Sequence, residues 1–244
     1  MKLLAICGSP RKGNTYKALT TVRDAFPGID FEILHLIDLD FKPCRGCYTC
    51  VLKGESKCPL KDDRDKIIEK IAEADGLILA SPVYSHMVSA LIKNLFERLG
   101  YMAHRPLFFH KFAMSMVTCS GYGAESALAY MDKMLGVYGF NLAPSLELQV
   151  HPGKVQKSTL AINRKKSIQA VEALMDKIVE IDLKIGKHVL DDMGKYVDIM
   201  FVHDDLATQD TLMFSPAAYR KLIKPRHQKI FNFIKTHSDA KIIY

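Results

Sequence analysis

The chain has 244 residues, of which 48% are apolar and 25% charged, an ordinary balance for a globular protein. No apolar run approaches the roughly 20 residues that cross a bilayer, and the N-terminus lacks a signal-peptide pattern, so we expect a cytoplasmic protein without a membrane partner. The basic residues are scattered among acidic ones, which argues against a nucleic-acid partner. The net charge of +7 favours anionic small ligands.

Up to residue 150 the sequence alternates short apolar runs with amphipathic segments. The apolar runs predict strands at residues 2–7, 32–36, 76–80, 112–118 and 146–150. The amphipathic segments predict helices at residues 16–26, 61–74, 88–99 and 125–138. This alternation is typical of an α/β fold, here a doubly wound five-stranded parallel sheet with helices on both faces. In such sheets ligands lie beyond the carboxyl ends of the strands.

The first predicted strand is followed by a loop of small and polar residues, GSPRKGNT at residues 8–15. A strand, a glycine-containing loop and then a helix is the geometry that turns backbone N–H groups and a positive helix end toward a phosphate. Gly8 and Gly13 allow the backbone to approach an anion closely. The side-chain donors and positive charges are those of Ser9, Arg11, Lys12, Asn14 and Thr15. The loop therefore predicts a phosphate cradle.

Two further loops follow the third and fourth predicted strands and should meet the cradle at the same edge of the sheet. Residues 81–86, SPVYSH, combine a stiffening proline with Tyr84, and residues 119–123, CSGYG, combine glycine with Tyr122. Aromatic rings in such loops pack against planar ligands. A phosphate cradle beside two aromatic loops predicts a flat cofactor with a phosphate tail, for which FMN is the candidate.

Three stretches, GSPRKGNT, ADGLILASPVY and SALIKNLFERLG, resemble the flavodoxin-like NADPH-dependent FMN reductase family over about residues 1–150. The resemblance implies an FMN phosphate held by Ser9, Arg11, Gly13, Asn14 and Thr15. It implies an isoalloxazine ring lined by Pro82, Val83, Tyr84 and Ser85 and flanked by Ser120, Gly121, Tyr122 and Gly123. It also implies NAD(P)H as electron donor and a homodimer or higher homo-oligomer. Because hydride chemistry in such a fold belongs to the flavin, no catalytic acid or base is nominated.

Four of the six cysteines are closely spaced, in the pattern C-x2-C-x2-C-x7-C formed by Cys44, Cys47, Cys50 and Cys58. Such spacing lets one short loop ligate several corners of an iron–sulfur cluster. The pattern resembles the motif of the iron–sulfur flavoproteins, which implies a [4Fe–4S] cluster that exchanges electrons with FMN. Structural zinc and free or redox-sensitive thiols remain open alternatives. Cys7 and Cys119 end apolar runs and are expected to be ordinary buried cysteines.

Beyond residue 150 the pattern changes. Residues 151–167 predict a linker, followed by a helix over 168–190, a strand over 196–202, a helix over 216–236 and a strand over 240–244. A helix plus a β-α-β unit cannot bury a core alone, so we expect it to pack on the first domain or on a partner. Residues 168–244 resemble part of the uroporphyrinogen decarboxylase family, in its corrinoid methyltransferase branch, which implies a piece of a β/α barrel without its zinc ligands. We expect His203, Asp204 and Asp205 to precede and cap a helix rather than bind metal.

The sequence thus predicts a flavodoxin-like FMN-binding domain over residues 1–150, a linker over 151–167 and a partial uroporphyrinogen decarboxylase-like segment over 168–244. The main functional hypothesis is an FMN-dependent oxidoreductase or electron-transfer flavoprotein. NAD(P)H or ferredoxin would reduce its flavin, which would pass electrons to a cluster, a quinone or another acceptor. The alternatives are an accessory flavoprotein that docks in a corrinoid methyltransferase system and a non-catalytic flavin-binding redox sensor.

Overall fold

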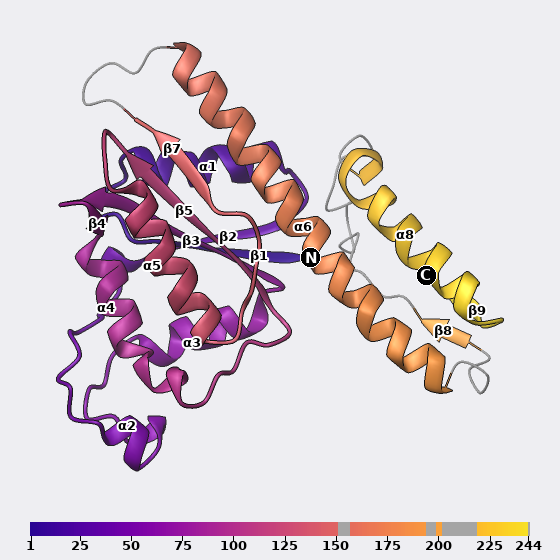
Figure 1. The fold of residues 1–244 in the computed structure, drawn as a ribbon, viewed down its shortest axis with the longest axis horizontal. Helices are drawn as coiled ribbons and strands as arrows, with labels where there is room; N and C mark the ends of the chain where they lie inside the picture. Colours follow the sequence, from indigo (N-terminus) through magenta and orange to yellow (C-terminus); the bar gives the residue numbers. More distant parts are fainter. Residues whose placement is uncertain (151–156, 194–198, 202–218, 244) are drawn as a thin grey trace, which may run out of the picture.

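A computed structural model describes residues 1–150, 157–193, 199–201 and 219–243 (Figure 1). Its centre is a parallel sheet of strand order β2-β1-β3-β5-β6, in which β7 also pairs with β5. The strands are β1 (Lys2–Cys7), β2 (Asp30–His35), β3 (Gly76–Tyr84), β5 (Phe112–Cys119), β6 (Asn141–Leu142) and β7 (Leu146–Gln149). This order is that of flavodoxin-like folds. The predicted doubly wound sheet is therefore confirmed: its predicted fifth strand is β7, and the two-residue strand β6 is an additional partner of β5. A two-residue strand, β4 (Met87–Val88), runs antiparallel to the end of β3.

The helices cover the sheet in two layers, one on each face (Figure 1). On one face lie α1 (Asn14–Ala25) and the first half of α6 (Lys157–Met193), and on the other lie α3 (Arg64–Glu73), α4 (Ala90–Arg98) and α5 (Ala124–Val137). Side chains of β1 alternate between the two cores: Leu4 and Ile6 join the core under α3, α4 and α5, whereas Leu3 and Ala5 join the core under α1 and α6. Because both faces of the strand are buried, its sequence is a continuous apolar run.

Short elements occupy the long connection from β2 to α3, which carries the four spaced cysteines. They are the 3-10 turn η1 (Leu36–Asp38), the helix α2 (Thr49–Leu52) and the 3-10 turn η2 (Glu55–Lys57). A further 3-10 turn, η3 (Gly100–Ala103), follows α4. We call residues 43–60 the cysteine loop.

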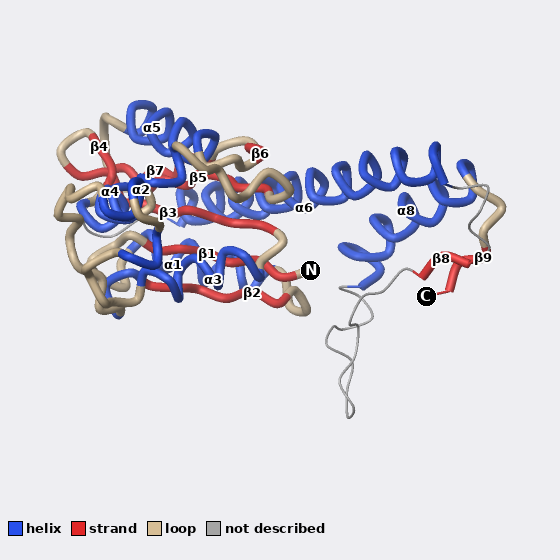
Figure 2. The backbone as a smooth tube through the Cα atoms, turned by 90° about the horizontal axis from the view of Figure 1, so that it is seen from below, coloured by secondary structure: helices blue, strands red, loops and turns tan. Residues whose placement is uncertain are grey.

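The long helix α6 corrects the predicted linker. It begins at Lys157, so residues 157–167 are helical, and only residues 151–156 of the predicted linker lie outside the described part of the chain. The buried side chains Val171, Leu174, Met175 and Ile178 belong to the same core as β1 and α1. Of the alternatives predicted for this segment, the structure shows packing on the first domain, and the helix continues past the sheet (Figures 1 and 2).

The end of the chain forms the predicted β-α-β unit. The strands β8 (Ile199–Phe201) and β9 (Lys241–Ile243) pair in parallel, and α8 (Lys224–His237), preceded by a π-helical turn, η5 (Tyr219–Ile223), lies along α6. Arg226 fastens α8 to α6 by donating to the carbonyl of Glu172 and by an ion pair with Asp176, both at 3.0 Å. His203, Asp204 and Asp205 lie outside the described residues.

Candidate functional site

The loop after β1 leaves the sheet at Gly8, which is fixed on two sides. The Gly8 N–H donates to the carbonyl of Ala80 at 2.8 Å, and the Ser89 hydroxyl donates to the Gly8 carbonyl at 2.6 Å. A Cβ atom at Gly8 would lie 2.2 Å from Cγ1 of Ile92. The end of β1 can approach α4 this closely only with glycine, so the backbone of the loop starts from a defined position.

Ser9 and Thr15 anchor the loop inside the protein. Ser9 is buried, its hydroxyl donates to the Arg11 carbonyl at 2.7 Å, and Nε2 of the buried His35 donates to the Ser9 carbonyl at 2.7 Å. Thr15 is also buried, and its hydroxyl shares a 2.6 Å hydrogen bond with the hydroxyl of Thr118 on β5. Both ends of the loop are thereby held in place before any ligand binds, which lowers the cost of ordering it.

The electrostatics of this loop favour an anion. The helix α1 begins at Asn14 with Gly13 as its N-cap, no side chain caps it, and its first turn contains no acidic residue. The first N–H groups of a helix have no partner within the helix and carry partial positive charge. Arg11 and Lys12 are exposed at the same place. This arrangement suits a phosphate group.

Three loops converge at the carboxyl edge of the sheet, as the sequence predicts. They line one cavity, which we call the cradle cavity; its empty volume, including space open to solvent, is about 540 Å³. Nine of its lining residues are predicted site residues: Ser9, Arg11, Gly13, Asn14, Thr15, Pro82, Val83, Tyr84 and Ser120. None of the described residues that line it is acidic. The phosphate loop and the first aromatic loop therefore face the same space.

The four other predicted site residues lie beside this cavity without lining it. Ser85 forms the turn between β3 and β4 together with His86, and both have positive φ, 49° and 64°, as in two-residue hairpins. Gly123 has φ +96°, and a Cβ atom there would lie 2.5 Å from Cα of His86. The loop containing Gly121, Tyr122 and Gly123 thus packs directly on the β3–β4 turn, and the Tyr122 side chain is 86% exposed.

Two lining residues, Thr118 and Val150, were missed by the sequence analysis. Thr118 is the buried penultimate residue of β5 and Val150 directly follows β7. The available signal for Thr118 was a hydroxyl residue directly before the predicted loop at residues 119–123, because strand ends in this fold point at the ligand edge.

The cysteine loop is closed at its base by a network we call the neck. The Asp63 N–H donates to the Asp40 carbonyl at 2.8 Å, and the Asp40 N–H donates back to the Asp63 carboxylate at 2.9 Å. Beside them the Arg98 guanidinium on α4 pairs with the Asp62 carboxylate at 2.7 Å, with side chains only 2% and 1% exposed. The Lys42 N–H donates to the same carboxylate at 3.1 Å. The neck therefore fixes both ends of the loop on the sheet domain.

The four thiols within the loop do not converge on a common centre. Cys44 and Cys47 are exposed, Cys50 and Cys58 are partly buried, and all six cysteines are free thiols. Across the described ranges, no group of three or more His, Cys, Asp or Glu side chains is arranged to hold a metal ion. The predicted ligands thus share one loop, but this arrangement of it does not fit a cluster.

One thiol differs from the others in its hydrogen bonding. The Thr49 hydroxyl donates to Sγ of Cys47 at 3.3 Å, and this bond lowers the pKa of the Cys47 thiol by stabilising the thiolate. Burial has the opposite effect on Cys7, whose pKa it raises. Cys7 and Cys119 are both buried, which confirms them as structural cysteines.

The strand order, together with a loop between β1 and α1 that suits a phosphate group, defines a flavodoxin-like α/β protein. The sequence matches the NADPH-dependent FMN reductase family over residues 1–154, and the chain belongs to that family. It is an oxidoreductase or electron-transfer flavoprotein that depends on FMN. Within the described residues, no helix is both long and apolar enough to span a membrane.

Several relatives are iron-sulfur flavoproteins. One from Archaeoglobus fulgidus is 32% identical over 209 residues, which cover 82% of this chain and 94% of that protein. One from Methanocaldococcus jannaschii is 46% identical over 101 residues, which cover 40% of this chain and 51% of that protein. The first match covers more of the chain than residues 1–154 supply, so it extends into the C-terminal part. The proposed uroporphyrinogen decarboxylase likeness of residues 168–244 stays a prediction.

A solved structure supports the fold. The NAD(P)H:quinone oxidoreductase from Methanothermobacter marburgensis superposes with a TM-score of 0.55 at 21% identity, covering 70% of this chain and 94% of that one. At this identity the similarity establishes the flavodoxin-like architecture.

Proposed function

We propose that the cradle cavity binds FMN with its phosphate against Ser9, Arg11, Gly13, Asn14 and Thr15. The isoalloxazine ring would lie along Pro82, Val83, Tyr84 and Ser85, flanked by Ser120, Gly121, Tyr122 and Gly123. The observation that carries this proposal is the convergence of the uncapped start of α1 with the ends of β3 and β5 on one cavity without acidic lining.

In this proposal the bound flavin supplies the redox chemistry, and the chain binds, orients and shields it. The buried hydroxyls of Ser9 and Thr15 fix the loop, so its N–H groups point at the phosphate before binding. The β3–β4 turn, braced by Gly123, positions Tyr84 beside the ring. NAD(P)H or reduced ferredoxin would be the electron donor, and a quinone, a metal cluster or another molecule the acceptor.

A pair of threonines on α1 tests the phosphate site. Thr15→Val removes a hydroxyl at the cradle cavity, whereas Thr20→Val removes an exposed hydroxyl that donates to the Lys17 carbonyl outside that cavity. Fluorescence titration of the flavin-free protein should show FMN binding about tenfold weaker for Thr15→Val and unchanged for Thr20→Val, because hydrogen bonds to charged groups are the stronger ones. Equal effects of the two variants, or no FMN binding by the unaltered protein, would contradict the assignment.

For the cysteine loop we propose a [4Fe–4S] cluster held by Cys44, Cys47, Cys50 and Cys58. The support is the ligand spacing and the iron-sulfur flavoprotein name of several relatives. The thiols lie apart in the described structure, so this loop would rearrange to bind a cluster, while the neck keeps its ends in place. Zinc and redox-sensitive thiols are the competing proposals.

Anaerobic purification and an absorption spectrum distinguish these proposals. A cluster gives broad visible absorbance that persists beneath the flavin bands and disappears in a Cys50→Ser variant. Metal analysis that finds zinc, or four alkylatable thiols in anaerobic protein, would contradict the cluster. Rapid bleaching of the flavin by NADPH favours a reductase, and indifference to pyridine nucleotides favours an electron carrier or a flavin-binding sensor.

The assembly of the protein is proposed to be a homodimer. The appendage formed by the second half of α6, α8, β8 and β9 would offer a docking surface if the protein serves a corrinoid methyltransferase system. Sedimentation of the purified protein tests the first statement, and co-purification with a corrinoid protein tests the second.

A further inference from the structure

The buried histidine at the end of β2, His35, lies behind the phosphate loop of residues 8–15. Its Nε2 donates to the Ser9 carbonyl at 2.7 Å, and the residue is only 6% exposed. Ser9 lines the cradle cavity and His35 does not, so this bond is made outside that cavity. Because a carbonyl oxygen can only accept a hydrogen bond, Nε2 carries a hydrogen in both the neutral and the charged ring. The contact with the loop therefore does not depend on the charge of His35.

The imidazole ring of His35 is held from two further sides. Nδ1 lies 3.4 Å from Oδ2 of Asp38 in η1, and the ring centroid lies 5.2 Å from that of Tyr16 on α1. The ammonium group of Lys12 lies 5.4 Å from the centroid of the Tyr16 ring. His35 thus contacts the phosphate loop, α1 and its own connection to η1 at once. The donor that binds the Ser9 carbonyl is therefore locked in position.

The Ser9 carbonyl needs such a donor because proline follows it. Pro10 has no N–H group, so the peptide that joins Ser9 to Pro10 offers an acceptor and no donor. A carbonyl oxygen carries partial negative charge and repels a nearby anion. If this oxygen turned toward the cradle cavity, it would oppose a phosphate at the place where Ser9 lines that cavity. The bond to His35 holds the oxygen elsewhere.

Neighbouring carbonyls of the loop are engaged in the same way. The Gly8 carbonyl accepts from the hydroxyl of Ser89, the N-cap of α4, at 2.6 Å. The Arg11 carbonyl accepts from the Ser9 hydroxyl at 2.7 Å and from the Gly13 N–H at 2.8 Å. These acceptors are therefore occupied within the protein before a ligand binds, and the Ser9 carbonyl joins them through a side chain of β2.

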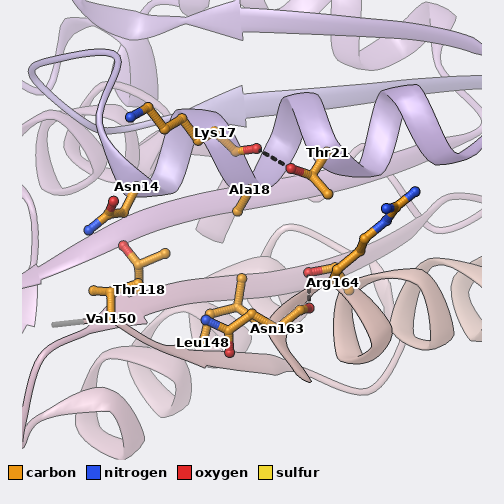
Figure 3. A pocket seen from close by; sticks show the side chains of 10 residues that line it. Asn14, Lys17, Ala18, Thr21, Thr118, Leu148, Val150, Asn163 and Arg164 are labelled. Atoms are coloured by element: carbon orange, nitrogen blue, oxygen red, sulfur yellow. Dashed lines mark hydrogen bonds between the residues drawn. The ribbon is translucent and has the colours of Figure 1, made fainter. Parts of the chain in front are cut away.

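The donors that face the cavity come from the other end of the loop. Figure 3 shows the side chains of Asn14, the first residue of α1, and of Thr118 on β5 pointing toward one another, and both residues line the cradle cavity. The uncapped N–H groups at the start of α1 lie beside them. A phosphate gains most from such donors when no acceptor competes at the same place. The preference of the loop for an anion thus depends on the bond between His35 and Ser9.

We propose that His35 is a positioning residue through which the cradle cavity selects a phosphorylated flavin, FMN, over riboflavin. By holding the Ser9 carbonyl outside the cavity, His35 leaves hydrogen-bond donors to meet the phosphate. The inference rests on the proposed function, because it requires the flavin phosphate to lie in the cradle cavity. Riboflavin has the same ring and ribityl chain but no phosphate, so its binding does not depend on this bond.

A matched pair of variants tests this assignment on the flavin-free full chain by fluorescence titration. His35→Met removes the donor, whereas His35→Gln, of the same length, keeps an amide N–H within reach of the Ser9 carbonyl. His35→Met should bind FMN about tenfold more weakly than the unaltered protein and riboflavin within about twofold. His35→Gln should restore FMN binding to within about threefold. If His35→Met leaves the ratio of FMN to riboflavin affinity unchanged, even through an equal loss of both, the proposal is overturned.

His35→Asn keeps the experiment decisive if His35→Met does not fold. Its amide is as polar as that of glutamine but ends near the position of Nδ1 rather than Nε2, so the ratio of FMN to riboflavin affinity should again fall about tenfold. A ratio equal to that of His35→Gln would also overturn the proposal. If the unaltered protein binds FMN no more tightly than riboflavin, the proposed phosphate site itself fails, and the role of His35 fails with it.

Discussion

The ion pair at the neck of the cysteine loop makes a sharp prediction. Arg98→Met removes a guanidinium whose Nη2 lies 2.7 Å from Oδ1 of Asp62, in a place where both side chains are almost fully buried. The variant leaves the Asp62 carboxylate without its cation. Two weaker donors remain, the N–H groups of Lys42 at 3.1 Å and of Arg64 at 3.3 Å.

The magnitude follows from what remains around the carboxylate. Removing one partner of a buried pair typically costs about 3–5 kcal/mol, because a buried charge stays behind. The two backbone donors offset part of this cost, so we expect the lower end, about 3 kcal/mol. Met has a similar length and keeps most of the apolar contact of the Arg98 stem, so the loss reports the charge rather than a cavity.

Urea unfolding followed by far-UV circular dichroism measures this loss. At an m-value of about 3 kcal/mol per molar urea the midpoint should fall by about 1 M. The matched control is Lys93→Met on the same helix, which breaks an exposed pair with Glu97 and should change stability by less than about 0.5 kcal/mol. A loss below about 1 kcal/mol for Arg98→Met would refute the idea that this pair holds the neck.

Three further variants test other contacts. Gly8→Ala should destabilise the protein by about 1–3 kcal/mol in the same urea assay, because its Cβ would lie 2.2 Å from Ile92, and an unchanged midpoint would contradict this. Thr49→Val should shift the pH midpoint of Cys47 alkylation upward, because the hydrogen bond that lowers the pKa of this thiol is lost and less thiolate exists at a given pH. Alkylation of the metal-free protein is measured against pH by mass spectrometry, and an unchanged pH midpoint would contradict this prediction. Arg226→Ala should speed amide exchange in α8 about tenfold while exchange in β1 stays constant, because two contacts to α6 are lost; equal acceleration in both would indicate a global effect.

The sheet was predictable because strands that are buried on both faces have continuous apolar sequences. The strand at residues 2–7 is found with its predicted bounds, and β5 extends one residue beyond its prediction. The start of α6 was missed for the opposite reason. Residues 157–167 are mostly polar and, where described, largely exposed, so no apolar periodicity marks them as helical.

The candidate site was predictable where the backbone dictates it. Loops after parallel strands meet at one edge, which brings Ser9, Pro82 and Ser120 to one cavity. The arrangement of the four spaced cysteines was not predictable in this way. Their spacing in the sequence shows that one loop can supply four ligands. No secondary-structure rule determines the direction in which the side chain of a loop residue such as Cys44 points.

The single helix α6 has a mechanical consequence. Its 37 residues span about 55 Å. The helix packs in the core of the sheet domain as far as Ile178, and α8 contacts it from Glu172 onward. Its sequence contains no proline, the residue that most often kinks a helix. The helix α8 thus packs on one continuous helix that also belongs to the sheet domain. A protein that docks on α8 would therefore lie at a fixed distance and angle from the cradle cavity, set by the continuous helix α6.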